Sequence, residues 1–272
     1  MTRTQARITD LAEKKRRGEK IAMLTAYDAV MARLFEHAGV DALLVGDSVG
    51  MTALGYDTTI PVTIDAMVHH SAAVHRGAPQ ALIVADLPFL TYQVGVTEAV
   101  KHAGRLLQEG GAVAVKLEGG RPVLDVVRRL VDTGIPVMGH LGLLPQSVHQ
   151  LGGYRRRGTE AVEADAILAD AVALEAAGAF AVVLESIPTD LARTVTAHVQ
   201  IPTIGIGAGP FCDGQILVGY DMLGFSAEPV PPFVKTYARL SEIVDAAARS
   251  YVDEVRSGQF PVTPVASRTS SR

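Results

Sequence analysis

The sequence has a single cysteine, no long hydrophobic run and no surplus of positive charge. Because Cys212 is the only cysteine, no intrachain disulfide can form. Gly, Pro or Asp interrupts the apolar runs well before the roughly 20 residues that a membrane-spanning helix needs. The net charge is -4, and both signs are dispersed along the chain. Nothing therefore favours a nucleic-acid partner or an anionic membrane.

The first twenty residues also lack a hydrophobic core. They are rich in charge, so we expect them not to be a signal peptide. Charged residues make up only 20% of the chain, as expected when parallel strands are buried on both faces. Hydrophobic residues make up 48% and suffice for a large core. These features predict a cytoplasmic globular protein.

What the sequence does contain is a regular alternation of strand-like and helix-like segments. The helix-like stretches carry apolar residues at spacings of three and four. Eight strands with helical crossovers predict a (β/α)8 TIM barrel, and a chain of 272 residues fits this fold. A doubly wound open sheet is the competing interpretation. The expected strands are 21–26, 42–46, 81–85, 112–117, 136–139, 181–184, 203–207 and 216–219, and helices are expected at 29–38, 64–76, 97–109, 123–133, 159–177 and 188–198.

Two further helices are expected outside this alternation. Residues 8–17 predict a helix that caps the floor of the barrel. Residues 232–257 predict a long C-terminal helix, more apolar than a solvated tail requires, which we expect to pack on the barrel or on a neighbouring subunit. The catalytic barrel domain should span 1–257, and 258–272 should form a flexible tail.

Acidic side chains follow three consecutive predicted strands. In this type of barrel, functional groups lie where strands end. Asp47 follows the second strand, Asp86 the third and Glu118 the fourth. Any one of them could simply serve a turn, but three converging carboxylates repel one another unless a cation or protons intervene. Oxygen ligands alone suit a hard ion, Mg²⁺ or Mn²⁺, rather than Zn²⁺. The pattern therefore predicts a magnesium site.

Lys116 and Glu118 are two residues apart on one strand, so their side chains share a face. Leu117 should point toward the helices. The lysine is either a charge partner of the acids or a cation for a substrate carboxylate, and the two roles are compatible. Across the barrel, Glu185 follows the sixth strand and is a candidate general base; the alternative is an N-cap of helix 188–198. His140 could bind substrate or be purely structural.

Six segments together resemble one known family, ketopantoate hydroxymethyltransferase. The resemblance covers nearly the whole chain, and its motifs are specific jointly, in order and spacing. The segments are MLTAYD (23–28), VGDSVG (45–50), VADLPF (84–89), AVKLEG (114–119), GHLG (139–142) followed by PQS (145–147), and IGIGAG (204–209).

The resemblance implies a phosphoenolpyruvate-mutase-like barrel that moves a one-carbon unit from 5,10-methylenetetrahydrofolate to 3-methyl-2-oxobutanoate. The product is 2-dehydropantoate, on the route to pantothenate. The resemblance also implies a homo-oligomer, usually a decamer. By the same resemblance, the metal ligands fall on Asp47, Asp86 and Glu118, the oxo-acid contacts on Asp47, Ser48, Asp86 and Lys116, and the proton acceptor on Glu185.

Mg²⁺ chelated by the substrate carboxylate and ketone would stabilise an enolate formed when the base removes the C3 proton. An alternative is an Mg²⁺-dependent oxo-acid lyase or mutase of the phosphoenolpyruvate-mutase type. Such lyases often carry a catalytic cysteine on a mobile loop, a context that Cys212 lacks. A non-catalytic barrel that serves as an assembly subunit is a third hypothesis, disfavoured by the cost of unliganded strand-end acids.

Overall fold

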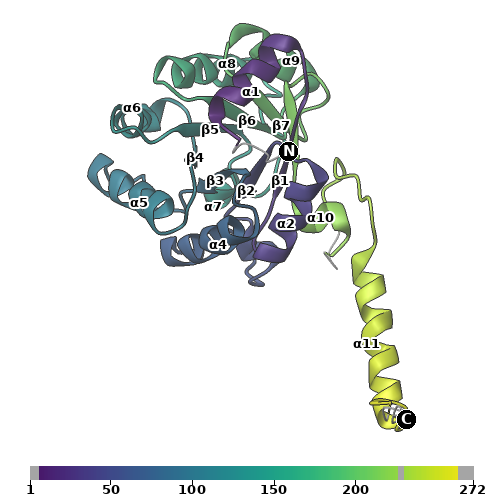
Figure 1. The fold of residues 1–272 in the computed structure, drawn as a ribbon. Helices are drawn as coiled ribbons and strands as arrows, with labels where there is room; N and C mark the ends of the chain where they lie inside the picture. Colours follow the sequence, from purple (N-terminus) through teal and green to yellow (C-terminus); the bar gives the residue numbers. More distant parts are fainter. Residues whose placement is uncertain (1–5, 226–229, 263–272) are drawn as a thin grey trace.

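Eight short apolar segments form a closed parallel barrel (Figure 1). A computed structural model of the protein describes residues 6–225 and 230–262. Strands adjacent in sequence pair with each other, and β1 also pairs with β8, so the doubly wound alternative is wrong. The strands are β1 (Ile21–Thr25), β2 (Ala42–Val45), β3 (Leu82–Asp86), β4 (Ala114–Glu118), β5 (Val137–Gly142), β6 (Ala181–Glu185), β7 (Thr203–Ile206) and β8 (Gly214–Leu217).

Helices connect most of the strands and form the outer layer of the barrel (Figure 1). The six crossover helices expected from the sequence are all present, with ends shifted by a few residues. They are α2 (Ala29–Ala38), α4 (Ile64–Gly77), α5 (Val96–Gln108), α6 (Leu124–Asp132), α8 (Ala161–Ala176) and α9 (Thr189–His198). Short elements that the sequence analysis did not anticipate lie in the loops: α3 (Val49–Thr52), η1 (Arg121–Val123), η2 (Pro145–Ser147), α7 (Val148–Leu151) and α10 (Gly219–Leu223).

The strands separate two hydrophobic clusters. One fills the barrel interior and includes Met23, Leu44 and Val84. The other lies between the strands and the helices, and Leu117 belongs to it as predicted. Because side chains alternate along a strand, Ala114 points inward while Leu117 points outward. The same alternation turns the polar residues at the carboxyl ends of the strands toward the barrel axis.

The helix α1 (Ile8–Arg17) covers the opposite, N-terminal end of the barrel, as predicted. Its Leu11 is buried within the interior cluster. Its Lys15 ammonium donates hydrogen bonds to three backbone carbonyls near β7 and lies 2.9 Å from Asp213 Oδ2. These contacts hold the helix against the barrel floor, at the end opposite to the carboxyl ends of the strands.

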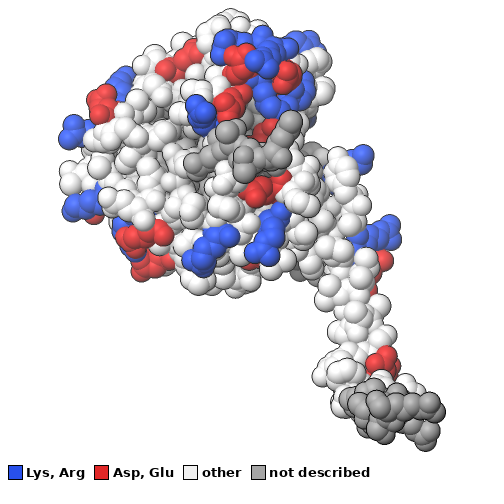
Figure 2. All heavy atoms as spheres, in the orientation of Figure 1, with Lys and Arg blue, Asp and Glu red and all other residues white. Residues whose placement is uncertain are grey.

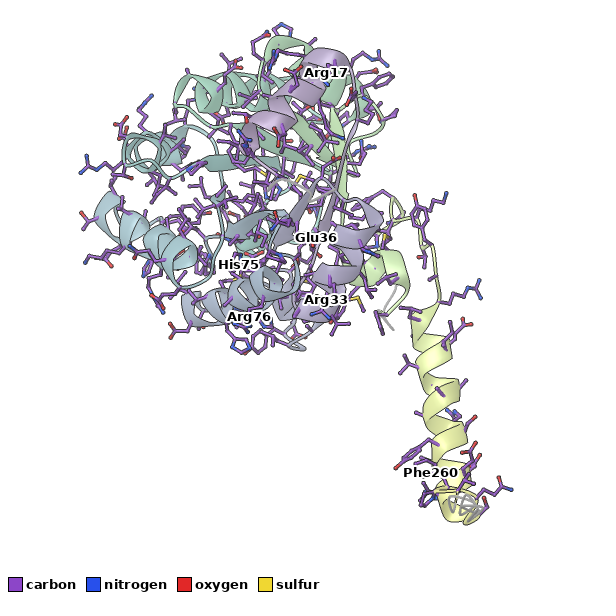
Figure 3. All side chains as sticks on the ribbon, in the orientation of Figure 1. Arg17, Arg33, Glu36, His75, Arg76 and Phe260 are labelled. Atoms are coloured by element: carbon purple, nitrogen blue, oxygen red, sulfur yellow. The ribbon has the colours of Figure 1, made fainter. Side chains whose placement is uncertain are left out.

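The C-terminal helix α11 (Leu240–Arg256) stands away from the barrel (Figure 1). It begins at Leu240 rather than at 232 as expected, and none of its residues is buried. On the face shown in Figure 2 most of its surface is uncharged. Phe260 lies near its far end (Figure 3), where the ring centroids of Tyr251 and Phe260 are 5.5 Å apart. The expectation that this helix packs on its own barrel is therefore wrong, and packing on a neighbouring subunit stays a prediction.

No helix in the described part of the chain is long and apolar enough to cross a membrane. The tail was expected to be flexible over 258–272. The part of this range after Val262 lies outside the described residues.

Candidate active site

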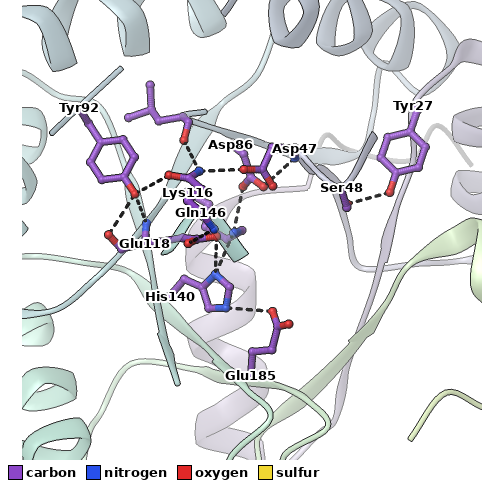
Figure 4. Close-up of polar contacts among 11 residues, drawn as sticks. Tyr27, Asp47, Ser48, Asp86, Tyr92, Lys116, Glu118, His140, Gln146 and Glu185 are labelled. Atoms are coloured by element: carbon purple, nitrogen blue, oxygen red, sulfur yellow. Dashed lines mark hydrogen bonds and ion pairs between the residues drawn. The ribbon is translucent and has the colours of Figure 1, made fainter. Parts of the chain in front are cut away.

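Four acidic side chains gather at the carboxyl ends of the strands, as predicted (Figure 4). Asp86, Glu118 and Glu185 are the last residues of β3, β4 and β6, and Asp47 lies two residues beyond β2. The acids Asp47, Asp86 and Glu118 are each at most 5% exposed. Strand register sets their neighbours, because Asp86 pairs with Lys116 across β3 and β4. Glu118 pairs with His140 across β4 and β5.

Lys116 lies within this acidic group. Its Nζ is 3.2 Å from Asp86 Oδ1, and both side chains are almost completely buried. Burial lowers the pKa of the ammonium, but the surrounding acids Asp86, Glu118 and Asp47 outweigh burial and raise the pKa above its ordinary value. Lys116 is therefore a charge partner of the acids, as one of the two sequence interpretations expected, and its contact with a substrate carboxylate stays a prediction.

One cation does not compensate all of the acids around it. Burial, followed by the Asp86 carboxylate, raises the pKa of Asp47 to about 7. Burial and the Asp47 carboxylate also raise the pKa of Glu118 well above its usual range. In both cases the Lys116 ammonium lowers the pKa, but it does not offset the effects of burial and of the neighbouring carboxylate. The site thus favours an additional positive charge or bound protons.

Glu185 lies on the far side of this group and contacts His140. Its side chain is 17% exposed, and its Oε2 is 3.1 Å from His140 Nε2. The N-cap of α9 is Pro188, with no side-chain cap, so the interpretation of Glu185 as a helix cap is wrong. The next residue, Ser186, has a φ of 49°, which is uncommon for a residue other than glycine. That conformation redirects the chain directly after the carboxylate.

A chain of hydroxyl groups leads to Ser48. The backbone N–H of Gly219 donates to Thr25 Oγ1, and the Thr25 hydroxyl donates to Tyr27 Oη at 2.9 Å. Tyr27 Oη lies 2.9 Å from Ser48 Oγ. Burial raises the pKa of Tyr27 to about 12, so its phenol stays protonated. Either hydroxyl can donate in the Tyr27–Ser48 hydrogen bond, and this bond fixes the position of the Ser48 side chain.

Three site residues were missed by the sequence analysis: Tyr27, Tyr92 and Gln146. Tyr27 and Gln146 lie inside segments that carry the family resemblance, and all three follow strand ends. A search of those loops for every hydrogen-bonding side chain, rather than for ionisable ones alone, would have included them. Gln146 contacts Asp47 and Glu118, and the hydroxyl of Tyr92 contacts Gln146 (Figure 4).

The donor set fits a hard divalent cation, although the structure does not preassemble three ligands. No group of three or more His, Cys, Asp or Glu side chains in the described residues is arranged to hold a metal ion. Asp47 and Asp86 are nonetheless adjacent, since the Asp47 backbone N–H donates to Asp86 Oδ2 at 3.0 Å. Asp86 Oδ1 is buried without a hydrogen bond, despite its ion-pair distance to Lys116. Mg²⁺ commonly uses one or two carboxylates together with water and substrate oxygens.

A closed eight-stranded parallel barrel whose functional side chains lie at the carboxyl ends of its strands is a TIM barrel of the kind that enzymes use. The fold is similar to that of 2,3-dimethylmalate lyase, with a TM-score of 0.60 and 18% identity, covering 96% of this chain and 91% of that one. It is also similar to phosphonopyruvate hydrolase in complex with oxalate and Mg²⁺, with a TM-score of 0.60 and 12% identity, covering 92% and 87%.

Closer relatives narrow this class to one family. The sequence pattern of ketopantoate hydroxymethyltransferase matches residues 5–263. The 3-methyl-2-oxobutanoate hydroxymethyltransferase of Moorella thermoacetica is 57% identical over 95% of this chain and 96% of its own. The enzyme of that name from Thermosynechococcus vestitus is 55% identical, over 96% and 100%. The chain belongs to the ketopantoate hydroxymethyltransferase family, as the sequence resemblance predicted.

Proposed function

We propose that the protein transfers a one-carbon unit from 5,10-methylenetetrahydrofolate to 3-methyl-2-oxobutanoate, giving 2-dehydropantoate for pantothenate biosynthesis. Relatives between 52% and 57% identical carry the name of this activity. The observation that carries the proposal is the pairing of a partly exposed carboxylate, Glu185, with a buried cation, Lys116, through His140. A base on one side and a fixed positive charge on the other suit removal of a proton next to a carbonyl group.

The oxo acid is an anion, and it must bind beside several acids. Lys116 and the hydroxyl of Ser48 are the donors available for its carboxylate and ketone oxygens. The acids Asp47, Asp86 and Glu118 would hold Mg²⁺, which would offset the burial and the mutual repulsion that raise the pKa of Asp47 and Glu118. Bound Mg²⁺ would draw electron density from the ketone oxygen and so make the C3 proton more acidic. The oxalate and Mg²⁺ in the phosphonopyruvate hydrolase complex support such a site.

The role proposed for Glu185 is to accept the C3 proton. The C3–H bond breaks, and the electron pair delocalises onto the ketone oxygen as an enolate. One of the two bonds between the methylene carbon and the folate nitrogens breaks, and C3 bonds to that carbon. Water then replaces the second folate nitrogen and supplies the hydroxyl group, and tetrahydrofolate leaves with the proton from C3 and one proton from water on its two nitrogens. No oxidation or reduction occurs. His140, whose ring nitrogens already face Lys116 and Glu185, holds the base instead of contacting substrate in this scheme.

We also propose a cytoplasmic homo-oligomer, a decamer by analogy with the family. The helix α11 supports assembly, because it exposes apolar side chains such as Ile243, Val244 and Tyr251 and buries none of its residues, and such a surface is unfavourable in water.

Turnover assays test the proposal. Purified protein with Mg²⁺, 3-methyl-2-oxobutanoate and 5,10-methylenetetrahydrofolate should form 2-dehydropantoate, detected by mass spectrometry. Glu185→Gln should lose at least about 100-fold in rate, whereas Glu98→Gln, which changes an exposed carboxylate on α5, should not. Cleavage of 2,3-dimethylmalate without folate, and no transfer with it, would instead identify an oxo-acid lyase, the activity named for one protein of similar fold.

A further inference from the structure

Gln146 contacts two of the acids at once. It lies in η2, immediately after β5, and is only 4% exposed. Its backbone N–H donates to Glu118 Oε2 at 3.0 Å. Its side-chain Nε2 donates to Asp47 Oδ2 at 2.8 Å and to the Leu87 carbonyl at 2.9 Å (Figure 4). One neutral residue thus joins the loops that follow β2, β3 and β5 to the end of β4.

The neighbours of Gln146 fix the orientation of its amide group. Oε1 accepts a hydrogen bond from Gln93 Nε2 at 3.2 Å and from the Tyr92 hydroxyl at 2.9 Å, and the Glu118 carbonyl, 3.1 Å from the same hydroxyl, shares its single hydrogen. Nε2 faces two oxygen acceptors, Asp47 Oδ2 and the Leu87 carbonyl. A flipped amide would place its oxygen against both of these acceptors and its NH₂ group against two donors. Only one orientation therefore satisfies all four contacts.

Tyr92 keeps the amide from moving. It is 1% exposed, and its oxygen accepts the Glu118 backbone N–H at 3.1 Å. The same hydroxyl therefore contacts the end of β4 and the amide that reaches Asp47. A side chain that is locked by its own hydrogen bonds can hold a carboxylate in one rotamer, which a mobile side chain could not do.

Gln146 donates a hydrogen bond to one oxygen of the Asp47 carboxylate and to one oxygen of the Glu118 carboxylate. It makes no hydrogen bond to the second oxygen of either group. An N–H donor favours the ionised carboxylate, and a carboxylate must be ionised to bind a metal. Mutation of groups that orient metal ligands from behind typically weakens metal affinity about 10–100-fold. Gln146 has the location and the donors for this role.

We propose that Gln146 is a positioning residue, which holds the Asp47 and Glu118 carboxylates in the arrangement that binds a divalent cation. The inference rests on the proposed metal-dependent function. It assigns a role to a residue that donates no ligand atom of its own and that contacts neither substrate nor metal in the proposed function.

Gln146→Met tests the side-chain hydrogen bonds separately from the backbone one. Methionine has a similar length and lacks the amide donors, and the variant keeps the backbone N–H that donates to Glu118. We expect the dissociation constant for Mn²⁺, measured by electron paramagnetic resonance of the free ion, to rise about 10–100-fold. The Mg²⁺ concentration that half-saturates turnover should rise by the same factor. Turnover at saturating Mg²⁺ should return close to the wild-type rate, since only affinity depends on Gln146.

Tyr92→Phe removes the hydroxyl that orients the amide and should raise the Mn²⁺ dissociation constant by a smaller factor, about 3–10-fold. Combined with Gln146→Met it should add little, because the two residues act as one unit. The matched control is Thr203→Val, which alters another buried polar residue. Thr203 is the first residue of β7, on the floor side of the barrel, and its hydroxyl donates a hydrogen bond to Asp213. It should lower the melting temperature and leave Mn²⁺ affinity unchanged.

The outcomes separate the inference from the function on which it rests. Wild-type protein that binds neither Mn²⁺ nor Mg²⁺, with or without oxo acid, would remove the metal-dependent function itself. Wild-type binding with an unchanged dissociation constant in Gln146→Met would overturn the positioning role and leave the function standing. If Gln146→Met does not fold, Tyr92→Phe decides, and unchanged Mn²⁺ affinity in that variant overturns the role.

Discussion

His140 Nε2 lies 3.1 Å from Oε2 of Glu185. On the other edge of the ring, Lys116 Nζ is 3.2 Å from His140 Nδ1. An ammonium group can only donate, so Nδ1 is the acceptor and the ring hydrogen belongs on Nε2, facing Glu185. Glu118 Oε1 is 3.6 Å from Nδ1, too far for a hydrogen bond. Burial and then Lys116 lower the pKa of His140, so the ring is neutral and this tautomer is favoured.

The first prediction follows from that tautomer. The Nε2–H group is poorly aimed at Glu185 in the free protein, because Nε2 has no well-formed hydrogen bond, and such contacts often tighten only when substrate binds. His140→Phe keeps a ring but removes the donor. A hydrogen bond to a charged group is worth about 1.5–3 kcal/mol, so kcat should fall about 10–100-fold.

The KM for the oxo acid should change little in His140→Phe, since the ring contacts the base and not the substrate in the proposed function. His140→Gln, whose amide can donate to Glu185, should recover part of the rate. Steady-state kinetics of both variants check this. A rise in KM with unchanged kcat would instead make His140 a substrate contact, as the sequence analysis first suggested.

The second prediction concerns the stability of metal-free protein. Burial and Asp86 raise the pKa of Asp47 to about 7, whereas an unfolded aspartate titrates near 4. A raised pKa of this kind contributes stability below about pH 4, and the contribution is lost as pH rises toward about 7. Asp47→Asn cannot ionise. In EDTA at pH 8 it should melt roughly 2–8 °C above wild type, for about 1–2 kcal/mol, and the gain should shrink toward pH 4.

Asp86→Asn is the informative contrast. Asp86 is the ion-pair partner of Lys116, so its removal leaves a buried ammonium less well compensated. That variant should melt below wild type. Both variants should bind Mg²⁺ more weakly in isothermal titration. Unchanged metal affinity in both would remove the two aspartates from the proposed ligand set, whatever their melting temperatures.

The strands and the strand-end acids could be predicted from the sequence because both depend on local periodicity. Alternation alone placed Lys116 and Glu118 inward and Leu117 outward, and the structure confirms that arrangement. Strand ends were less certain. The fifth strand was expected to stop at residue 139, but it extends to Gly142 because it pairs with β6 as far as Glu185. Pairing between distant segments sets that end, and no local pattern encodes it.

The contacts of Gln146 could not be predicted for a related reason. Its partners Asp47 and Glu118 lie 99 and 28 residues away in sequence. Whether its amide reaches them depends on the path of the loop after β5, including the unexpected elements η2 and α7. The sequence marked the segment by resemblance, but the role of the side chain required the three-dimensional arrangement.

The third prediction concerns α11. It exposes several apolar side chains, with Ile243 60% and Tyr251 57% exposed. Exposed apolar side chains gathered on one helix are unfavourable in an isolated subunit. A chain that ends at Pro231 should sediment as a smaller species or aggregate in analytical ultracentrifugation. A soluble particle with an unchanged number of subunits would exclude α11 from the assembly contacts.

The fourth prediction isolates the first chemical step. In the proposed function, removal of the C3 proton needs the base and the metal but not the folate. With Mg²⁺ and without the folate donor, the protein should therefore exchange the C3 proton of 3-methyl-2-oxobutanoate for solvent deuterium. Proton NMR should show loss of the C3–H signal. Chelation of the metal with EDTA should stop the exchange. Wild-type protein that shows no exchange without folate would mean that the proton is shielded from solvent or that deprotonation and carbon–carbon bond formation are concerted.

Glu185→Gln then tests which group takes the proton. Glutamine keeps the shape and an acceptor for His140 Nε2–H, but it lacks a basic oxygen. Removal of a general base typically costs about 10²–10⁴-fold, so exchange should slow by at least that factor. Affinity for the oxo acid should change little, because Lys116 and Mg²⁺ would hold it. Glu98→Gln, an exposed carboxylate on α5, serves as the matched control and should exchange at the wild-type rate. Equal exchange rates in Glu185→Gln and wild type would place the base elsewhere, and His140, 3.1 Å from that carboxylate, would be the next residue to test.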